Sequence, residues 1–226
     1  MVCSVSDRAT GSEITILDSD AVRRWVRASA GQLAAERDFL TQLDAAIGDA
    51  DHGVNMDRGF SAAVTDLEAA PALQAGELLQ RVGTTLIYRV GGAAGPLFGA
   101  MYRAMGVALG TVDSVDGERL LEALRAGLDA VQRLGAAVVG DKTMVDAYAP
   151  ALEALEGELR SGGSLPAATR AAAEAAREGV RSTIQLQARK GRASYLGARS
   201  VGHQDPGATS TALLFSALAL VVDREP

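Results

Sequence analysis

The chain has 226 residues, of which 48% are hydrophobic, 22% charged and 4% aromatic, and its formal net charge is −6. This length suffices for one domain with a full core, and the acidic balance argues against nucleic acid as a partner, because phosphate backbones need a basic face. Cys3 is the only cysteine and cannot form an internal disulfide, and the first 20 residues lack the basic segment and apolar run of a signal peptide. We therefore expect a cytoplasmic protein with a single domain over residues 1–226, of which residues 1–18 are a flexible extension.

Apolar residues recur at helical spacing along most of the chain, which is rich in the helix-favouring residues Ala and Leu. The first helical pattern follows an N-cap at Asp18 or Ser19 and continues to Ile47, where Gly48 ends it. Further helices are expected around residues 60–67, 78–86, 120–131, 144–155, 166–187 and 208–222. Residues 84–90 have the content of a strand but lack a partner of similar character. The last apolar run is too short to span a membrane, because a span needs roughly 20 residues. We predict an all-α fold of about eight helices.

Three aspartates lie within eight residues in the segment LTQLDAAIGDADHGVNM, residues 40–56. Asp44 is expected near the end of a helix, and Asp49 and Asp51 on the turn after Gly48. Carboxylates this close repel one another unless a positive charge lies between them, and Mg²⁺ prefers such hard oxygen ligands. The other interpretation is that these residues cap the next helix. The segment alone does not decide between the two.

A glycine-rich turn, GGAAGPLFG, covers residues 91–99. Pro96 marks the start of a helix, where backbone N–H groups point outward and bind phosphate oxygens. The segment lacks the lysine of a P-loop. Taken alone, it is more typical of close helix packing through Gly95 and Gly99.

A second unusual segment, QARKGRASYLGARSVGHQDPGATST, covers residues 187–211. It carries Arg189, Lys190, Arg192 and Arg199 among glycines, and then the turn Asp205-Pro206-Gly207 before the last helix. Basic side chains on such a backbone suit an anionic ligand or a lid. His203 is more typical of a turn-stabilising donor than of a ligand. If the helices are antiparallel, these loops meet at one end, and their residues together predict a magnesium–nucleotide site there.

These segments, together with GDKTM at residues 140–144, closely resemble the nucleotide-binding L subunit of dihydroxyacetone kinase over about residues 21–222. The resemblance implies a barrel of about eight antiparallel amphipathic helices with the nucleotide site at one end. It implies two Mg²⁺ ions held by Asp44, Asp49 and Asp51. The nucleotide, ADP or ATP, is then expected to contact His52, Gly53, Val54, Asn55, Ala93, Ala94, Gly135, Met144, Arg192, Asp205, Pro206 and Gly207. The chain departs from the family pattern at two positions. It has Ala94 where the family often has a serine, and Ala198 where relatives have an acidic residue. Both departures concern the affinity for nucleotide.

The resemblance also implies a function. The chain would take part in Mg²⁺-dependent phosphoryl transfer to dihydroxyacetone held on a separate K subunit, without a covalent intermediate on its own side chains. A phosphohistidine-carrying M subunit of the phosphotransferase system would recharge the bound ADP. Two alternatives stay open: an ATP-dependent ketose kinase acting on dihydroxyacetone or erythrulose, and a module that reports its nucleotide state to a transcription regulator. The ketose and the oligomeric state, including a homodimer, also stay open.

Overall fold

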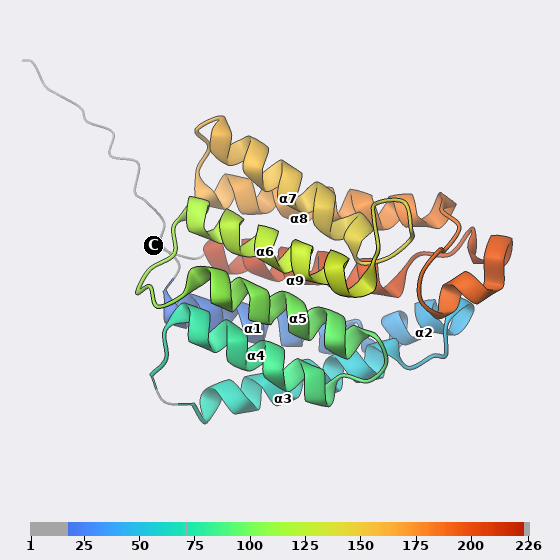
Figure 1. The fold of residues 1–226 in the computed structure, drawn as a ribbon, viewed down its shortest axis with the longest axis horizontal. Coiled ribbons are helices and arrows are strands. Elements are labelled where there is room, and N and C mark those ends of the chain that lie inside the picture. The colour runs from blue at the N-terminus through green and yellow to red at the C-terminus, as the bar shows by residue number, and fades with distance from the viewer. Residues whose placement is uncertain (1–17, 71, 224–226) are drawn as a thin grey trace, which may run out of the picture.

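A computed structural model describes residues 18–70 and 72–223, and over these residues the chain is helical without a β-strand (Figure 1). The α-helices are α1 Ser19–Ala35, α2 Arg37–Ile47, α3 His52–Glu68, α4 Ala75–Arg89, α5 Ala94–Leu109, α6 Gly117–Gly135, α7 Val145–Arg160, α8 Leu165–Ser182 and α9 Pro206–Val222. Two 3₁₀ segments, η1 Thr183–Gln185 and η2 Arg192–Ser200, lie between α8 and α9. The all-α prediction is confirmed. Within the described part of the chain, each helix is too short or too polar to cross a bilayer.

Side-chain caps explain where several helices begin. Asp18 Oδ1 accepts the N–H of Ala21 at 2.7 Å and caps the start of α1, as predicted. Asp18 therefore belongs to the folded part of the chain. The other residues of the predicted extension, 1–17, lie outside the described residues. Asp116 and Ser164 cap α6 and α8 in the same way. The strand-like residues 84–90 continue α4 as far as Arg89, because the strong helical pattern that begins at Ala75 outweighs their local content.

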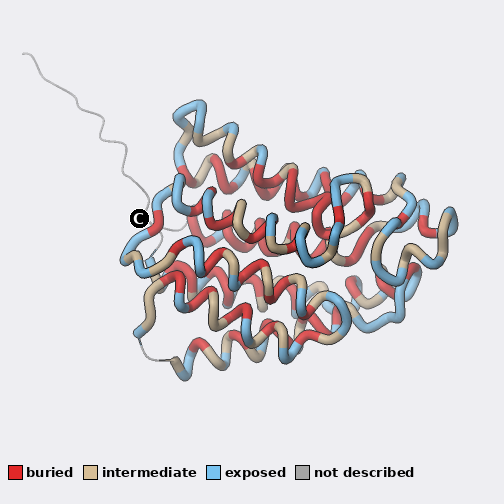
Figure 2. The backbone as a smooth tube through the Cα atoms, viewed as in Figure 1, coloured by how far each residue is buried: buried red, intermediate tan, exposed pale blue. Residues whose placement is uncertain are grey.

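α2 continues in the direction of α1, and from α3 to α9 successive helices run in alternating directions and lie side by side (Figure 1). α1 packs against α3, each helix from α3 to α8 packs against the next, and α9 packs back against α1, while α2 extends α1 at one end. A closed ring of neighbouring helices of this kind is what a helical barrel requires. The barrel itself stays a prediction. Buried positions lie where the helices face one another (Figure 2), and the largest fully buried side chains include Tyr102, Tyr148, Phe60 and Phe98.

Glycines allow α4 and α5 to pack closely together. A Cβ atom on Gly83 would lie 2.5 Å from the carbonyl oxygen of Gly99, and one on Gly99 would lie 2.7 Å from that of Gly83. Gly95 is equally confined, because its Cβ would lie 2.3 Å from the carbonyl oxygen of Val90. The helix-packing interpretation of Gly95 and Gly99 is therefore correct.

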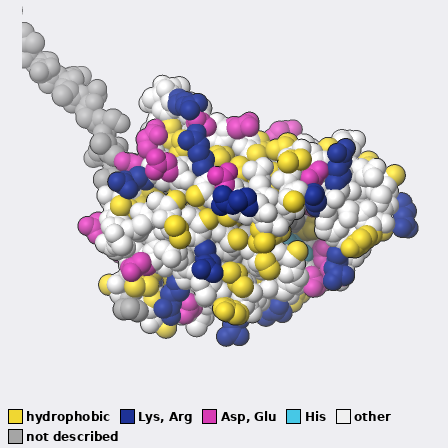
Figure 3. All heavy atoms as spheres, in the orientation of Figure 1, with side chains coloured by type: hydrophobic (Ala, Val, Ile, Leu, Met, Phe, Trp, Pro, Cys, Tyr) yellow, Lys and Arg dark blue, Asp and Glu magenta, His cyan; other side chains and the backbone are white. Residues whose placement is uncertain are grey.

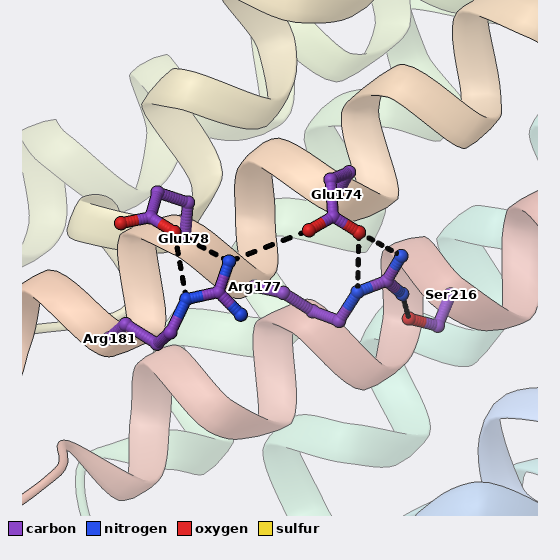
Figure 4. Close-up of polar contacts among 5 residues, drawn as sticks. All are labelled: Glu174, Arg177, Glu178, Arg181 and Ser216. Atoms are coloured by element: carbon purple, nitrogen blue, oxygen red, sulfur yellow. Dashed lines mark hydrogen bonds and ion pairs between the residues drawn. The ribbon is translucent and has the colours of Figure 1, made fainter.

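Charged side chains cover the outer face of α8 (Figure 4). Arg177 contacts Glu174 at 2.7 Å and reaches across to Ser216 Oγ of α9 at 3.0 Å, while Arg181 contacts both Glu178 and Glu174. These pairs are exposed, so each contributes little to stability. On the face drawn in Figure 3, basic and acidic side chains are interspersed, with apolar side chains between them.

Four connections meet at one end of the molecule, on the right in Figure 1. They are residues 48–51, 90–93, 136–144 and 183–205. They carry Asp49 and Asp51, the start of the glycine-rich turn, the GDKT segment and most of the basic loop. The alternating helix directions thus bring together the segments that the sequence singled out.

Candidate functional site

These four connections surround a cavity of about 310 Å³, a size within the range of small-molecule sites. Most of the predicted site residues line it: Asp44, Asp49, Asp51, His52, Asn55, Ala93, Ala94, Gly135, Met144, Arg192, Asp205, Pro206 and Gly207. Gly53 and Val54 do not. Gly53 faces α2, where an added Cβ would lie 2.0 Å from the carbonyl oxygen of Arg37, and Val54 is exposed. Both lie on the first turn of α3, whose helical twist turns them away from the cavity.

The three aspartates form one cluster. Asp44 lies on the last turn of α2, and Asp49 and Asp51 follow on the turn before α3. Ala50 between them has a left-handed φ of +62°, a strained conformation for a residue with a Cβ. One carboxylate oxygen from each aspartate lies within 4.8 Å of the other two. This set of hard oxygen donors fits a magnesium ion.

Of the three clustered aspartates, only Asp44 also caps a helix with its side chain. Its Oδ2 accepts the N–H groups of Asp51 at 2.9 Å and His52 at 3.2 Å, which begin α3. Asp51 makes no capping bond with its own side chain. The capping interpretation therefore holds for Asp44 alone, whereas the carboxylates of Asp49 and Asp51 do not serve as caps in this structure.

His52 joins α3 to α9 beneath the aspartates. Its Nε2 lies 2.8 Å from Ser210 Oγ, and burial lowers the pKa of His52, while the nearby charges of Asp44 and Asp51 oppose that shift. Burial thus favours the neutral ring, which accepts or donates a hydrogen bond according to its tautomer. This contact connects the turn that carries Asp49 and Asp51 to the start of the last helix.

The glycine-rich turn forms the facing wall. Gly92 has φ +63°, and a Cβ on Gly91 would lie 2.8 Å from the Asn55 amide, so a side chain at either position would be costly. α5 begins at Ala94, two residues before Pro96, and no side chain caps it. Its first N–H groups are therefore available to an anion in the cavity. The segment serves both interpretations: residues 91–94 line the site, and Gly95 and Gly99 pack helices.

An apolar wall completes the cavity. It consists of Ile47, Leu97, Phe98, Val131, Ala137, Met144 and Val145. Such a surface suits a flat, weakly polar group such as a nucleotide base. Apart from Met144, these residues are missing from the sequence prediction, because their periodicity is the same as that of ordinary core residues.

The basic loop closes over the aspartates. Arg192 Nε lies 3.1 Å from Asp49 Oδ2, and Lys190 and Arg192 both line the cavity. The loop therefore lies over the site, as its composition suggested. The backbone carbonyl oxygen of His203 accepts a hydrogen bond from Lys142. The residue is exposed, and its ring makes no hydrogen bond to any residue that the structure describes, so the predicted role of the side chain as a donor is not seen.

Lys142 also lines the cavity and is missing from the predicted set of site residues. It is 1% exposed, and its Nζ donates to the carbonyl oxygens of Thr183, at 2.5 Å, and of His203. Asp205 lies nearby, accepts the N–H of Ala208 and caps α9. Burial raises the pKa of Asp205 to about 7, although the hydrogen bond from the Ala208 N–H and the charge of Lys142 both act to lower it. The segment GDKT places a lysine beside a glycine turn, but this local pattern does not show that the lysine is buried, because its partners lie 41 and 61 residues away.

Comparison with known proteins now adds to this geometry. Residues 46–220 match the model of the DAK2 domain family. The chain is 44% identical to the ADP-binding subunit DhaL of the PEP-dependent dihydroxyacetone kinase of Escherichia coli, over 90% of this chain and 97% of that one. It is 41% identical to a D-erythrulose kinase of Mycolicibacterium smegmatis, over 85% of this chain but only 33% of that one.

A solved structure also shares the fold. The dihydroxyacetone kinase of C. freundii, solved in complex with AMP-PNP and Mg²⁺, is 27% identical and superposes with a TM-score of 0.68. The match covers 97% of this chain and 37% of the C. freundii chain. This chain therefore spans little more than a third of that enzyme.

Proposed function

The chain belongs to the DAK2 domain family, and we propose that it is the ADP-binding subunit of a dihydroxyacetone kinase that takes its phosphoryl group from phosphoenolpyruvate. One observation supports this most strongly. Three carboxylates suited to Mg²⁺ and an uncapped helix N-terminus suited to phosphate line the same 310 Å³ cavity. The E. coli relative, which the match covers almost completely, carries the same function in its name.

In the proposed site, Asp44, Asp49 and Asp51 hold Mg²⁺, which when bound offsets the negative charge of the phosphates. Three aspartates and a triphosphate carry roughly −7, so two ions leave roughly −3, a charge that Arg192 and the start of α5 further reduce, whereas one ion leaves roughly −5. We therefore propose two ions.

The protein groups of the site orient the phosphates and exclude water. The N–H groups at Ala93 and Ala94 bind phosphate oxygens, the apolar wall receives the base, and Arg192 moves from Asp49 to the phosphates. Phosphoryl transfer of this kind depends on position and charge neutralisation, so it needs no covalent step on this chain.

The proposal includes two partners. The ketose is held by a K subunit, and a phosphohistidine-carrying M subunit recharges ADP while it remains bound. Nucleotide that survives a purification of about ten minutes must leave more slowly than about 10⁻³ s⁻¹, which corresponds to a Kd near 1 nM at a typical association rate.

Retention of nucleotide therefore tests the proposal. The chain is purified with Mg²⁺, its bound nucleotide is measured after denaturation, and it is then mixed with a K subunit and either the phosphoenolpyruvate system or ATP. We expect stoichiometric ADP and transfer only with the phosphoenolpyruvate system. Protein that arrives empty and turns over with ATP would support the second candidate, an ATP-dependent ketose kinase, which the erythrulose kinase relative favours.

A further inference from the structure

The loop between α8 and α9 leaves and re-enters the helical body at one narrow place. We call this place the neck and define it as Thr183, Ile184, Gly202 and His203. The N–H of Gly202 donates to the carbonyl oxygen of Ile184 at 2.7 Å, so the two sides of the neck touch. Thr183 Oγ1 accepts the N–H of Asp205 at 3.0 Å. The neck therefore fixes both the loop that carries Arg192 and the turn 205–207 that lines the cavity.

Lys142 joins the two sides of the neck. Its ammonium donates to one carbonyl oxygen on each side, those of Thr183 and His203. It comes from the connection between α6 and α7, far from both partners in sequence. One side chain thus connects three segments of the chain at the edge of the cavity.

The backbone around Lys142 is held firmly in place. Lys142 has a left-handed φ of +61°, and Asp146 accepts the N–H groups of Gly140 at 2.5 Å and Thr143 at 2.7 Å. The carbonyl oxygen of Asp141 accepts the N–H of Arg189, the first basic residue of the loop, at 3.0 Å. A strained conformation persists only where its surroundings fix it, and such positions cluster at functional sites.

Burial of a charged amine is expensive unless its hydrogen bonds are satisfied. Two carbonyl oxygens accept from Lys142. Burial lowers the pKa of Lys142, and the nearby charges of Asp205 and Asp146 oppose that shift. Lys142 and Lys190 are the only lysines in the chain. Lys190 lies in the loop itself, whereas Lys142 is nearly inaccessible to solvent.

We infer that Lys142 is a positioning residue that keeps the neck closed and so holds Arg192 and the turn 205–207 across the cavity before nucleotide binds. The expected effect of Lys142 on nucleotide binding rests on the proposed function. The closure of the neck is independent of the proposed function, because it can be measured without nucleotide.

Amine labelling of the unmodified protein is the first test. The nucleotide-free chain is treated with a dilute acylating reagent, and the two lysines are quantified separately by mass spectrometry. We expect Lys142 to react about 100-fold more slowly than Lys190, because it becomes accessible only when the neck opens. Comparable rates would show an open neck in solution and would overturn the inference.

Trypsin gives the second test, because the loop contains the cleavage sites Arg189, Lys190, Arg192 and Arg199. In nucleotide-free Lys142→Met, which keeps the side-chain length but loses the donors, we expect cleavage in the loop to accelerate about tenfold while the circular dichroism spectrum is unchanged. Lys190→Met is the matched control, and its cleavage at the three arginines should equal that of the original chain. Equal cleavage of Lys142→Met and the original chain would overturn the inference.

MgADP release separates positioning from direct contact. We expect Lys142→Met to release MgADP about tenfold faster, together with its faster cleavage. Faster release with unchanged cleavage would make Lys142 a nucleotide ligand and would also overturn the inference. If the original chain bound no nucleotide, the proposed function would fail while the labelling and cleavage results still tested the neck. If Lys142→Met did not fold, the labelling of the original chain would decide.

Discussion

Asp44 and Asp49 belong to one carboxylate cluster but differ in what else they hold. Asp44 caps α3 through two N–H groups, whereas Asp49 contacts the exposed Arg192. Gly48 protects this arrangement, because a Cβ there would lie 1.9 Å from Asp44 Oδ1. The same substitution should therefore have different effects at the two positions.

Asp49→Ala should abolish Mg²⁺-dependent ADP binding and transfer with little loss of stability, because it removes a ligand and an exposed ion pair. Asp44→Ala should abolish binding and also lower stability by about 1 kcal/mol, or roughly 2–4 °C in Tm, because a helix cap is lost. Calorimetric titration and thermal unfolding of the nucleotide-free chain measure the two effects. Asp38→Ala, at an exposed position of α2, is the control that should change neither. Undiminished activity of Asp49→Ala would contradict the metal assignment.

Two fully buried tyrosines provide a matched comparison. The Tyr148 hydroxyl donates to the carbonyl oxygen of Leu124 at 3.0 Å. The Tyr102 hydroxyl lies near Ser29 Oγ, but neither oxygen meets hydrogen-bond geometry with any residue that the structure describes. We expect Tyr148→Phe to cost about 1 kcal/mol and Tyr102→Phe to be close to neutral, because only the first loses a hydrogen bond. Urea unfolding gives both values, and equal losses would contradict the assignment.

At the scale of elements, the contact between α4 and α5 depends on small residues. Gly99→Ala places a methyl group 2.7 Å from a backbone oxygen of α4, which cannot move without shifting the helix, so we expect a loss of about 1–3 kcal/mol. Gly31→Ala in α1 is the control. It is exposed, has no atom within 4 Å of the new Cβ, and should gain about 0.5–1 kcal/mol, because alanine favours the helix. Chemical denaturation measures both, and similar effects of the two substitutions would contradict the packing described.

An ion pair links α3 to α4. Asp66 accepts from Arg81 Nε at 2.8 Å, from another Arg81 nitrogen at 2.7 Å and from Thr85, and the hydrogen bonds to Arg81 hold the pKa of Asp66 below its usual range. Because the folded-state pKa is the lower one, this stabilisation is present above the unfolded pKa of about 3.9 and disappears as the pH falls through the folded value. The pair is partly exposed, which limits its contribution.

We expect Asp66→Asn to lower stability at pH 6 by less than about 1 kcal/mol, and this difference to shrink as the pH falls below the unfolded pKa of about 3.9 and to vanish below the folded-state pKa of Asp66. Unfolding curves of the two proteins across this pH range measure it. Since the pair is partly exposed, 1 M salt should also reduce the difference. A difference that persisted in acid would show that Asp66 acts through packing instead.

At the scale of the whole molecule, the cavity is built from four connections that only the complete fold brings together. A ligand that contacts all four binds the folded chain and not the unfolded one. MgADP at about 1,000 times its Kd should therefore stabilise the chain by about 4 kcal/mol, which raises Tm by roughly 8–16 °C for a domain of this size. Differential scanning calorimetry measures the rise, and chelation of Mg²⁺ by EDTA should remove most of it. A rise that EDTA left unchanged would contradict the role of the aspartates.

The sequence alone determined the features that depend on neighbours along the chain. Apolar spacing located the helices, Asp18 marked the start of the first one, and the aspartates, the glycine-rich turn and the basic loop each carried a local chemical signal. The resemblance to a known family added a set of contact residues, most of which line the cavity. Local patterns suffice here because a helix is held together by residues three and four positions apart.

Only the tertiary structure decided which of these residues do what. It separated Asp44 as a cap from Asp49 and Asp51, turned Gly53 and Val54 away from the cavity, and brought apolar residues from separate helices into one wall. It also buried Lys142 against carbonyl oxygens 41 and 61 residues away. Contacts of that range depend on how the helices pack, and packing leaves no periodic trace in the sequence around a single lysine.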